Sequence, residues 1–151
     1  SVEGKIMIAG LFFTSSPGTS PKLARGMRKL QDEFSNDPSV RLMLISVNPQ
    51  ADSLPELVKF ANTYEAITGK WDLLTGDKAE IESFARKDLY LECYEGKGGE
   101  MGFHYAPDFR VVDQDGELRG SWNYDGTNAN DMDTLITHVR LLEIEHARKN
   151  R

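Results

Sequence analysis

The sequence predicts one α/β domain, a mixed central sheet covered by helices on both faces. In the first half, short apolar runs alternate with segments whose apolar residues repeat at helical spacing, which indicates the order βαβα. The second half contains two strands around an Asp-Gly turn and then a final helix. Because 151 residues, 39% of them hydrophobic, suffice for one core but not comfortably for two, we expect residues 1–151 to form a single domain.

The first strand and the helix after it have the clearest signals. Residues 5–13, KIMIAGLFF, form a nearly continuous apolar run, as expected of a strand buried on both faces. Ser20 is a favoured N-cap residue and Pro21 suits the first helical position, so we expect a helix to begin there. Apolar residues then repeat along one helix face, at Leu23, Met27, Leu30 and Phe34.

Two further helices and a second strand complete the first part of the chain. Residues 40–47, VRLMLISV, predict a second buried strand. A helix follows Pro55 and is marked by Leu57, Val58, Ala61 and Tyr64. The spacing of Asp77 and Glu80 is typical of a capping box, which predicts a third helix carrying Ile81, Phe84 and Ala85.

The second half supplies an antiparallel pair of strands. We expect one strand near residues 89–94 and two more within residues 109–122, FRVVDQDGELRGSW, joined at the Asp-Gly turn. Asp131 is expected to cap a final helix whose inward residues are Leu135, Val139 and Leu142. A βαβα half followed by an antiparallel ββα half is the thioredoxin-like arrangement.

Composition excludes several classes of partner and site. The 24 acidic residues outnumber the 18 basic ones, and the net charge of −6 argues against binding to nucleic acid or to anionic lipid. No apolar run approaches the roughly 18 residues that a membrane-spanning helix needs. The single cysteine, Cys93, excludes an internal disulfide and a metal cluster held by cysteines alone.

The loop FFTSSPGTSPKL, residues 12–23, is the expected place for chemistry. In this arrangement the loop lies at the carboxyl edge of the sheet, and the first N–H groups of the next helix point towards it. Such a place favours anions and thiolates, but the chain has Ser16 and Ser20 there. A serine hydroxyl stays protonated at neutral pH unless a base takes its proton, so both serines are expected to be poor nucleophiles.

The stretch FFTSSPGTSPKLARGMRKLQ resembles the active loop of the Sco (SenC) copper chaperones, where an aromatic pair precedes Thr-x-Cys-Pro-x-x-Cys-Pro. Three later stretches are similar to segments of the same family, in the same order: LISVNPQADSLPELVKFA, WDLLTGD and FHYAPDFRVVDQDGELRG. The resemblance covers residues 4 to about 125. It implies a thioredoxin-like fold for the whole of that length.

The resemblance also implies a metal site and a cellular role. The two cysteine ligands of the family correspond to Ser16 and Ser20, and its histidine ligand corresponds to His104. Family members help to deliver copper to cytochrome c oxidase, and thiol–disulfide chemistry is often proposed beside metal transfer. The implied partners are the copper-site subunit of the oxidase or another copper chaperone. The implied location is the periplasmic side of the bacterial inner membrane, or less expectedly the mitochondrial intermembrane space, with an anchor absent from this fragment and no membrane contact by the fragment itself.

Serine changes what such a site can bind. Two thiolates and an imidazole suit Cu(I), whereas a protonated hydroxyl oxygen is a hard, weak ligand for it. We therefore expect weak or absent Cu(I) binding and no disulfide exchange at Ser16 and Ser20. Two origins stay open: a natural relative that lost its metal chemistry, favoured by Asn48 where the family usually has Asp, and a laboratory substitution of both cysteines, favoured by the retained residues around them.

Other candidate residues have simpler interpretations beside the functional ones. Asp52 is either a residue that orients the site or, as is commoner in such loops, a solvated surface carboxylate. Without the resemblance, His104 would be an exposed histidine after the glycine-rich loop GKGGEMGF. Met101 is a possible thioether ligand, although a methionine that fills a gap is more common. Cys93 alternates with Leu89 and Leu91 on the expected strand, which favours a small buried side chain over a reactive thiol.

The last helix and the hairpin turn carry two further patterns. His138 and His146 are eight residues apart, too far to share a metal on one helix face, and are expected to be solvated. Residues 113–116, DQDG, lack the further ligands of a calcium loop, so the hairpin turn is the better interpretation.

Three classes of function remain. The first is a Sco-type copper-chaperone domain with an impaired Cu(I) site, and the second is a metal-free module that uses the scaffold to bind a partner. The third is an enzyme. The loop lacks the thiolate that peroxidase or thiol–disulfide chemistry needs, and a hydrolase based on Ser16 or Ser20 with His104 lacks any oxyanion-hole motif. We therefore expect no enzymatic activity unless cysteines are native at the two serine positions.

Overall fold

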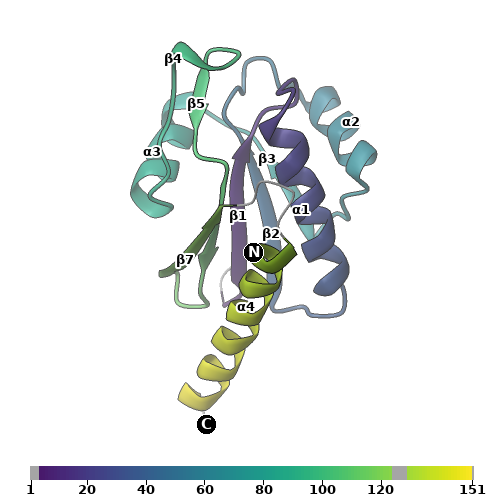
Figure 1. The fold of residues 1–151 in the computed structure, drawn as a ribbon, viewed down its shortest axis with the longest axis vertical. Helices are drawn as coiled ribbons and strands as arrows, with labels where there is room; N and C mark the ends of the chain where they lie inside the picture. Colours follow the sequence, from purple (N-terminus) through teal and green to yellow (C-terminus); the bar gives the residue numbers. More distant parts are fainter. Residues whose placement is uncertain (1–3, 124–128, 151) are drawn as a thin grey trace.

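The computed structural model describes residues 4–123 and 129–150, and its centre is a five-stranded mixed sheet of order β3-β2-β1-β6-β7 (Figure 1). The strands are β1 (Ile6–Phe12), β2 (Val40–Ser46), β3 (Trp71–Leu74), β6 (Asp108–Val112) and β7 (Leu118–Asn123). β1, β2 and β3 are parallel, whereas β6 is antiparallel to both β1 and β7. The predicted mixed α/β sheet is confirmed.

Helices cover both faces of this sheet. They are α1 (Thr19–Glu33), α2 (Leu54–Tyr64), α3 (Lys78–Asp88) and α4 (Ala129–Lys149). Buried residues of α1, α2 and α4 join one core, and those of α3 join a second core on the opposite face. A separate two-stranded sheet, β4 (Cys93–Glu100) with β5 (Phe103–Tyr105), lies beside the main sheet above α3 in Figure 1.

β1 belongs to both cores because its side chains alternate between the two faces of the sheet. Ile6, Ile8 and Phe12 pack in the first core, and Met7, Ala9 and Leu11 pack in the second. Every residue of β1 is buried, so the prediction of a strand covered on both faces is confirmed.

The start of α1 differs from the prediction. Gly18 is the cap residue and makes no side-chain cap hydrogen bond, so Ser20 lies within the first turn and Pro21 is the third helical residue. The Ser20 N–H instead donates to the Oγ of Ser16 at 3.2 Å. The prediction of Ser20 as N-cap was therefore wrong, because its hydroxyl turns inward to other partners.

The middle of the chain contains two further differences. The strand expected near residues 89–94 begins only at Cys93, because Leu89 ends α3 and Leu91 lies between the two elements, although both are buried. The glycine-rich stretch after it is a hairpin instead of a loop. This hairpin requires Gly99, which has φ +68° and whose Cβ, if it had one, would lie 2.5 Å from the carbonyl oxygen of Phe103.

Two predicted helix caps have different outcomes. The Asp77 carboxylate accepts the Glu80 N–H at 3.1 Å and caps α3, as predicted. Asp131 does not cap α4, since the helix begins at Ala129 and Asp131 lies inside its first turn. The inward positions of α4, Leu135, Val139 and Leu142, are buried as expected.

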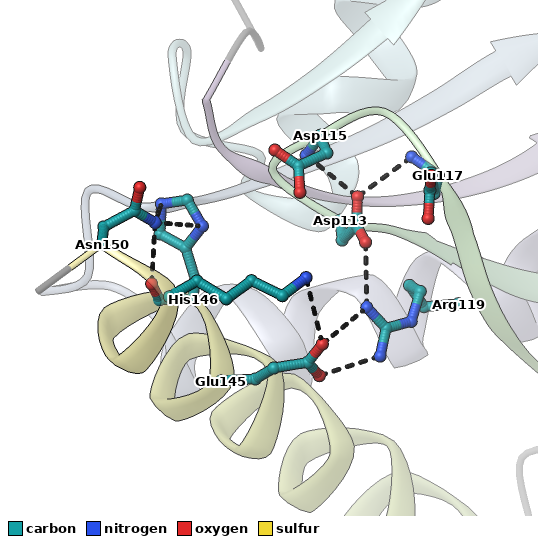
Figure 2. Close-up of polar contacts among 8 residues, drawn as sticks. Asp113, Asp115, Glu117, Arg119, Glu145, His146 and Asn150 are labelled. Carbon is teal, nitrogen blue, oxygen red and sulfur yellow. Dashed lines mark hydrogen bonds and ion pairs between the residues drawn. The ribbon is translucent and has the colours of Figure 1, made fainter.

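The β6–β7 turn is tied to α4 by charged side chains (Figure 2). Asp113 accepts the backbone N–H groups of Asp115 and Glu117 at 2.9 and 3.0 Å, which closes the predicted Asp-Gly turn. Its other oxygen accepts from Arg119 at 3.0 Å, and Arg119 also donates to Glu145 of α4 at 2.8 Å.

Among the helices in the described part of the chain, none combines the length and apolar character needed to cross a bilayer.

Candidate functional site

Asp52 anchors the loop between β1 and α1 through hydrogen bonds to its carboxylate. The Asp52 carboxylate accepts the N–H of Thr14 at 3.1 Å, the hydroxyl of Thr14 at 2.6 Å and the hydroxyl of Ser46 at 2.7 Å. Asp52 is 1% exposed, so the expectation of a solvated surface carboxylate was wrong. Its contacts connect the end of β2 to the loop that carries the two serines.

The structure brings Ser16 and Ser20 together, as expected, with both hydroxyls turned into the protein. Ser16 is 4% exposed and Ser20 is fully buried. The Ser20 Oγ accepts the N–H of Phe13 at 3.0 Å and lies 3.1 Å from the phenolic oxygen of Tyr105. Tyr105 also donates to the Ser16 Oγ, at 3.4 Å. Three hydroxyl groups from two distant segments therefore meet at the start of α1.

His104 does not join this group in the described structure. Neighbouring residues of a strand point to opposite faces, and on β5 it is Tyr105 that faces the serines. The imidazole of His104 stacks on Tyr94, with centroids 4.5 Å apart and rings 9° from parallel, and its Nε2 lies 2.9 Å from the carbonyl oxygen of Lys97. The metal-binding role of Ser16, Ser20 and His104 stays a prediction.

Tyr105 is the residue that sequence reasoning missed. The inner face of the β4–β5 hairpin packs on Phe13, whose ring lies 5.0 Å from Phe103 and 5.8 Å from Tyr105 between centroids. This packing directs the Tyr105 hydroxyl towards the serines. The available signal was the alternation of an extended segment, which places the neighbour of His104 on the face opposite to it.

The donor atoms at this loop do not suit Cu(I). The three converging groups are hydroxyl oxygens, which are hard donors that remain protonated at neutral pH. Across residues 4–123 and 129–150 there is no group of three or more His, Cys, Asp or Glu side chains placed to hold a metal ion. Met101 is 61% exposed on the β4–β5 hairpin. The His104 imidazole, which a serine hydrolase at this loop would need as its base, lies on the other face of the hairpin.

The single cysteine of the chain, Cys93, packs in the second core. Cys93 is 4% exposed, and burial, with the charge of Glu82 as a smaller cause, raises the pKa of its thiol to about 11. The prediction of a small buried side chain is confirmed.

The prediction that His138 is solvated was wrong, because its side chain is half-buried against Trp122. Its Nε2 lies 3.2 Å from the carbonyl oxygen of Arg119.

A shallow hollow of about 210 Å³ lies between α1 and α2, next to the loop that joins β1 to α1. Thr14 and Pro21 line one side, and Phe60 and Tyr64 of α2 line the other. Lys59 and Glu56 lie at the same hollow and give it both signs of charge. The hollow thus presents apolar, acidic and basic side chains next to the loop.

Known proteins share the sequence pattern and the fold of this chain. The family model for SCO1/SenC matches residues 1–140. A SCO1 protein homolog from Bacillus subtilis is 30% identical over 142 residues, which are 93% of this chain and 72% of that protein. The structure of BsSco, described as having a disulfide switch and as a member of the Sco family of cytochrome c oxidase assembly proteins, has a TM-score of 0.77 and 28% identity, covering 93% of this chain and 81% of that one.

A more distant structure shares the fold. Arabidopsis thaliana ScoI, solved with copper bound, has a TM-score of 0.74 at 18% identity and covers 95% of this chain and 87% of the other. The predicted thioredoxin-like fold is confirmed by these structures. The match of the family model over nearly the whole length and the identity to the Bacillus homologue lead to one conclusion: this chain belongs to the SCO1/SenC family.

Proposed function

We propose that this chain is a Sco-type domain that acts in cytochrome c oxidase assembly, where copper is the cargo, and that its loop holds Cu(I) weakly or not at all. One observation carries the proposal: Ser16 and Ser20, at the positions expected for the thiol ligands, have their oxygens engaged with Tyr105 and with backbone N–H groups. The fold and the loop position are retained, but the soft donors are not.

The loss of affinity follows from the chemistry of the donor atoms. A thiolate is an anion that binds Cu(I) strongly, whereas a serine oxygen carries its proton and offers little to a soft metal. The Ser20 oxygen contacts the N–H of Phe13 and the hydroxyl of Tyr105, neither of which is a base, so these contacts do not activate the Ser20 hydroxyl as a ligand or a nucleophile. The chain as written also cannot exchange disulfides at these positions, and we propose that it has no enzymatic activity of its own.

The partner and the location are part of the same proposal. The copper-site subunit of cytochrome c oxidase, or another copper chaperone, would contact the loop and the hollow between α1 and α2. We place the domain on the periplasmic side of a bacterial inner membrane, held there by a segment outside these 151 residues. The bacterial source of the 30% identical homologue supports a bacterial over a mitochondrial location.

A metal-free partner-binding module is the second candidate. The observation that favours it is the closed hydrogen bonding of the loop, in which Ser20 is fully buried and bonded to Phe13 and Tyr105. A loop that needs no ligand to satisfy its polar groups can present a fixed surface. In this case the partner would bind with the same affinity whether copper is present or not.

A Cu(I) competition titration under reducing conditions separates the two candidates. The chain is compared with Ser16→Cys/Ser20→Cys and with Ser15→Cys/Ser20→Cys, which has the same number of thiols but one of them on the exposed Ser15. We expect one tightly held Cu(I) only in Ser16→Cys/Ser20→Cys. If no variant binds, the chaperone function fails and the partner-binding module leads. If the unchanged chain binds Cu(I) as tightly as Ser16→Cys/Ser20→Cys does, the argument from serine chemistry is wrong.

A further inference from the structure

The outer face of α4 is an exposed stripe that the proposed copper function does not use. Figure 1 shows α4 in front of the sheet, with its last turns extending beyond the ends of the strands. Met132, Leu135, Val139 and Leu142 form its buried side. The opposite side, at helical spacing, is what we call the α4 stripe: Asp133, Thr137, Leu141, Ile144 and Arg148.

The centre of the α4 stripe is apolar. Leu141 is 56% exposed and Ile144 is 51% exposed. Leu141 borders two adjoining hollows, one of about 430 Å³ with Trp122 and Thr137 on its wall, and one of about 510 Å³ with Ile144 and Arg148 on its wall. Leu141, which borders both hollows, and Ile144, which borders the second, are suited to contact with apolar side chains of another molecule.

The ends of the α4 stripe carry opposite charges. Asp133 lies near the start of the helix and Arg148 in its last turn, and within the part of the chain that the structure describes neither has an ion-pair partner. The neighbouring charges are already paired: Glu145 with Arg119 (Figure 2) and Arg140 with Glu33. The α4 stripe is therefore acidic at one end, apolar in the middle and basic at the other end.

This pattern is self-complementary under a two-fold axis. If two α4 helices lie antiparallel with the axis between positions 140 and 141, Asp133 faces Arg148 of the second copy and Thr137 faces Ile144. The two Leu141 side chains then meet at the axis. Asp133 and Arg148 are about 22 Å apart along the helix, so both ion pairs form in one straight antiparallel contact. Antiparallel helices also place opposite dipole ends side by side.

We propose that the α4 stripe is the interface of a reversible homodimer in which two copies of this chain pair α4 antiparallel. A closed two-fold contact uses the same patch on both copies, as the charge pattern of the α4 stripe requires. The contact is small and has exposed ion pairs at its rim. Interfaces below about 1,200 Å² form weak complexes, so we expect dissociation at roughly tens of micromolar.

Sedimentation equilibrium between roughly 5 and 500 µM, at about physiological salt, tests the interface because this range brackets the expected affinity. Leu141→Arg is expected to abolish the dimer throughout that range. The matched control is Leu54→Arg, which changes an exposed leucine of α2 that is 73% exposed and lies outside the α4 stripe. The control variant should dimerise like the unchanged chain.

Charge reversal tests the antiparallel register. Asp133→Lys or Arg148→Glu alone converts both ion pairs of the dimer into like-charge contacts and should weaken it roughly tenfold to thirtyfold. The combination Asp133→Lys/Arg148→Glu restores opposite charges and should recover most of the affinity. Circular dichroism and thermal unfolding of each variant separate a lost contact from a lost fold.

Three results would overturn the proposal. The first is a chain that stays monomeric up to the highest concentration, which would leave the α4 stripe to a different protein. The second is a dimer that survives Leu141→Arg, which would place the interface on another surface. The third is a double charge variant that dimerises no more tightly than the single variants, which would exclude the pairing of Asp133 with Arg148. None of these results bears on Cu(I) binding, so this test and the copper titration fail or succeed independently.

Discussion

Replacing Asp52 with alanine is expected to lower the free energy of unfolding by about 3 kcal/mol. The carboxylate is 1% exposed and accepts three donor groups: the N–H and hydroxyl of Thr14 and the hydroxyl of Ser46. Ser46 is fully buried, so its hydroxyl would lose a partner that water does not readily replace. Such a stranded buried group costs about 1–3 kcal/mol.

The contribution of Thr14 is smaller because its residue is only partly buried. Its two bonds to a carboxylate are each worth about 1.5 kcal/mol at the low end for a charged acceptor, but water reaching Thr14 in the variant recovers most of that and leaves a loss of about 1 kcal/mol. With about 2 kcal/mol for Ser46, the total is near 3 kcal/mol. Asp52→Asn should cost about half as much, since it keeps one carbonyl acceptor but places an NH₂ group opposite a donor.

Urea unfolding at pH 7, followed by the fluorescence of the buried Trp71, measures these changes. The control is Glu92→Ala, which removes an exposed carboxylate and should shift the free energy by less than about 0.5 kcal/mol. Amide exchange at Thr14 should also become faster in Asp52→Ala, because the acceptor of its N–H is gone. The reasoning is refuted if Asp52→Ala lies within about 1 kcal/mol of the unchanged chain with an equal m-value.

Two further predictions concern titratable groups. Burial by itself would raise the pKa of Asp113, but donors from Glu117, Arg119 and Asp115 outweigh it and hold this pKa below its usual value. The stability it adds is present above the unfolded pKa and is lost as the pH falls through the folded one, so the urea midpoint should fall as the pH drops below about 4, and Asp113→Asn should lack that part of the fall. An unchanged acid limb in the variant would contradict this. For Cys93, whose pKa burial raises to about 11, iodoacetamide at pH 8 should react at least roughly tenfold more slowly in the folded chain than in urea. Equal rates would mean that the thiol is not shielded.

The sequence predicted the elements whose signals are local. The apolar run of β1 predicted a strand buried on both faces, and the spacing of Asp77 and Glu80 predicted the cap of α3. The cap of α1 could not be predicted in this way. Ser20 has the right residue type, but the N–H of Phe13 and the hydroxyl of Tyr105 take up its oxygen inside the protein. The local sequence allows either Gly18 or Ser20 as the cap of α1, and contacts made in the folded protein select Gly18.

The site was predicted in part for the same reason. The loop motif located Ser16 and Ser20, and their proximity needs only the first turn of α1. The position of Tyr105 depends on the β4–β5 hairpin, which the glycine-rich sequence did not indicate. Gly99 allows the backbone of this hairpin, and the stacking of Tyr94 on His104 fixes its outer face. Neither effect leaves a periodic pattern of apolar residues.

The place of β1 in the sheet has a consequence for how the chain is made. One edge of β1 pairs with β2, which follows closely in the sequence, whereas Ile8 on the other edge pairs with Val111 of β6. During synthesis the ribosome therefore releases an apolar strand whose second edge has no partner until most of the chain has been translated. An open apolar edge of this kind is a template for pairing with other chains. The nascent first half is thus the stage of synthesis at which this chain is most prone to pair with other chains.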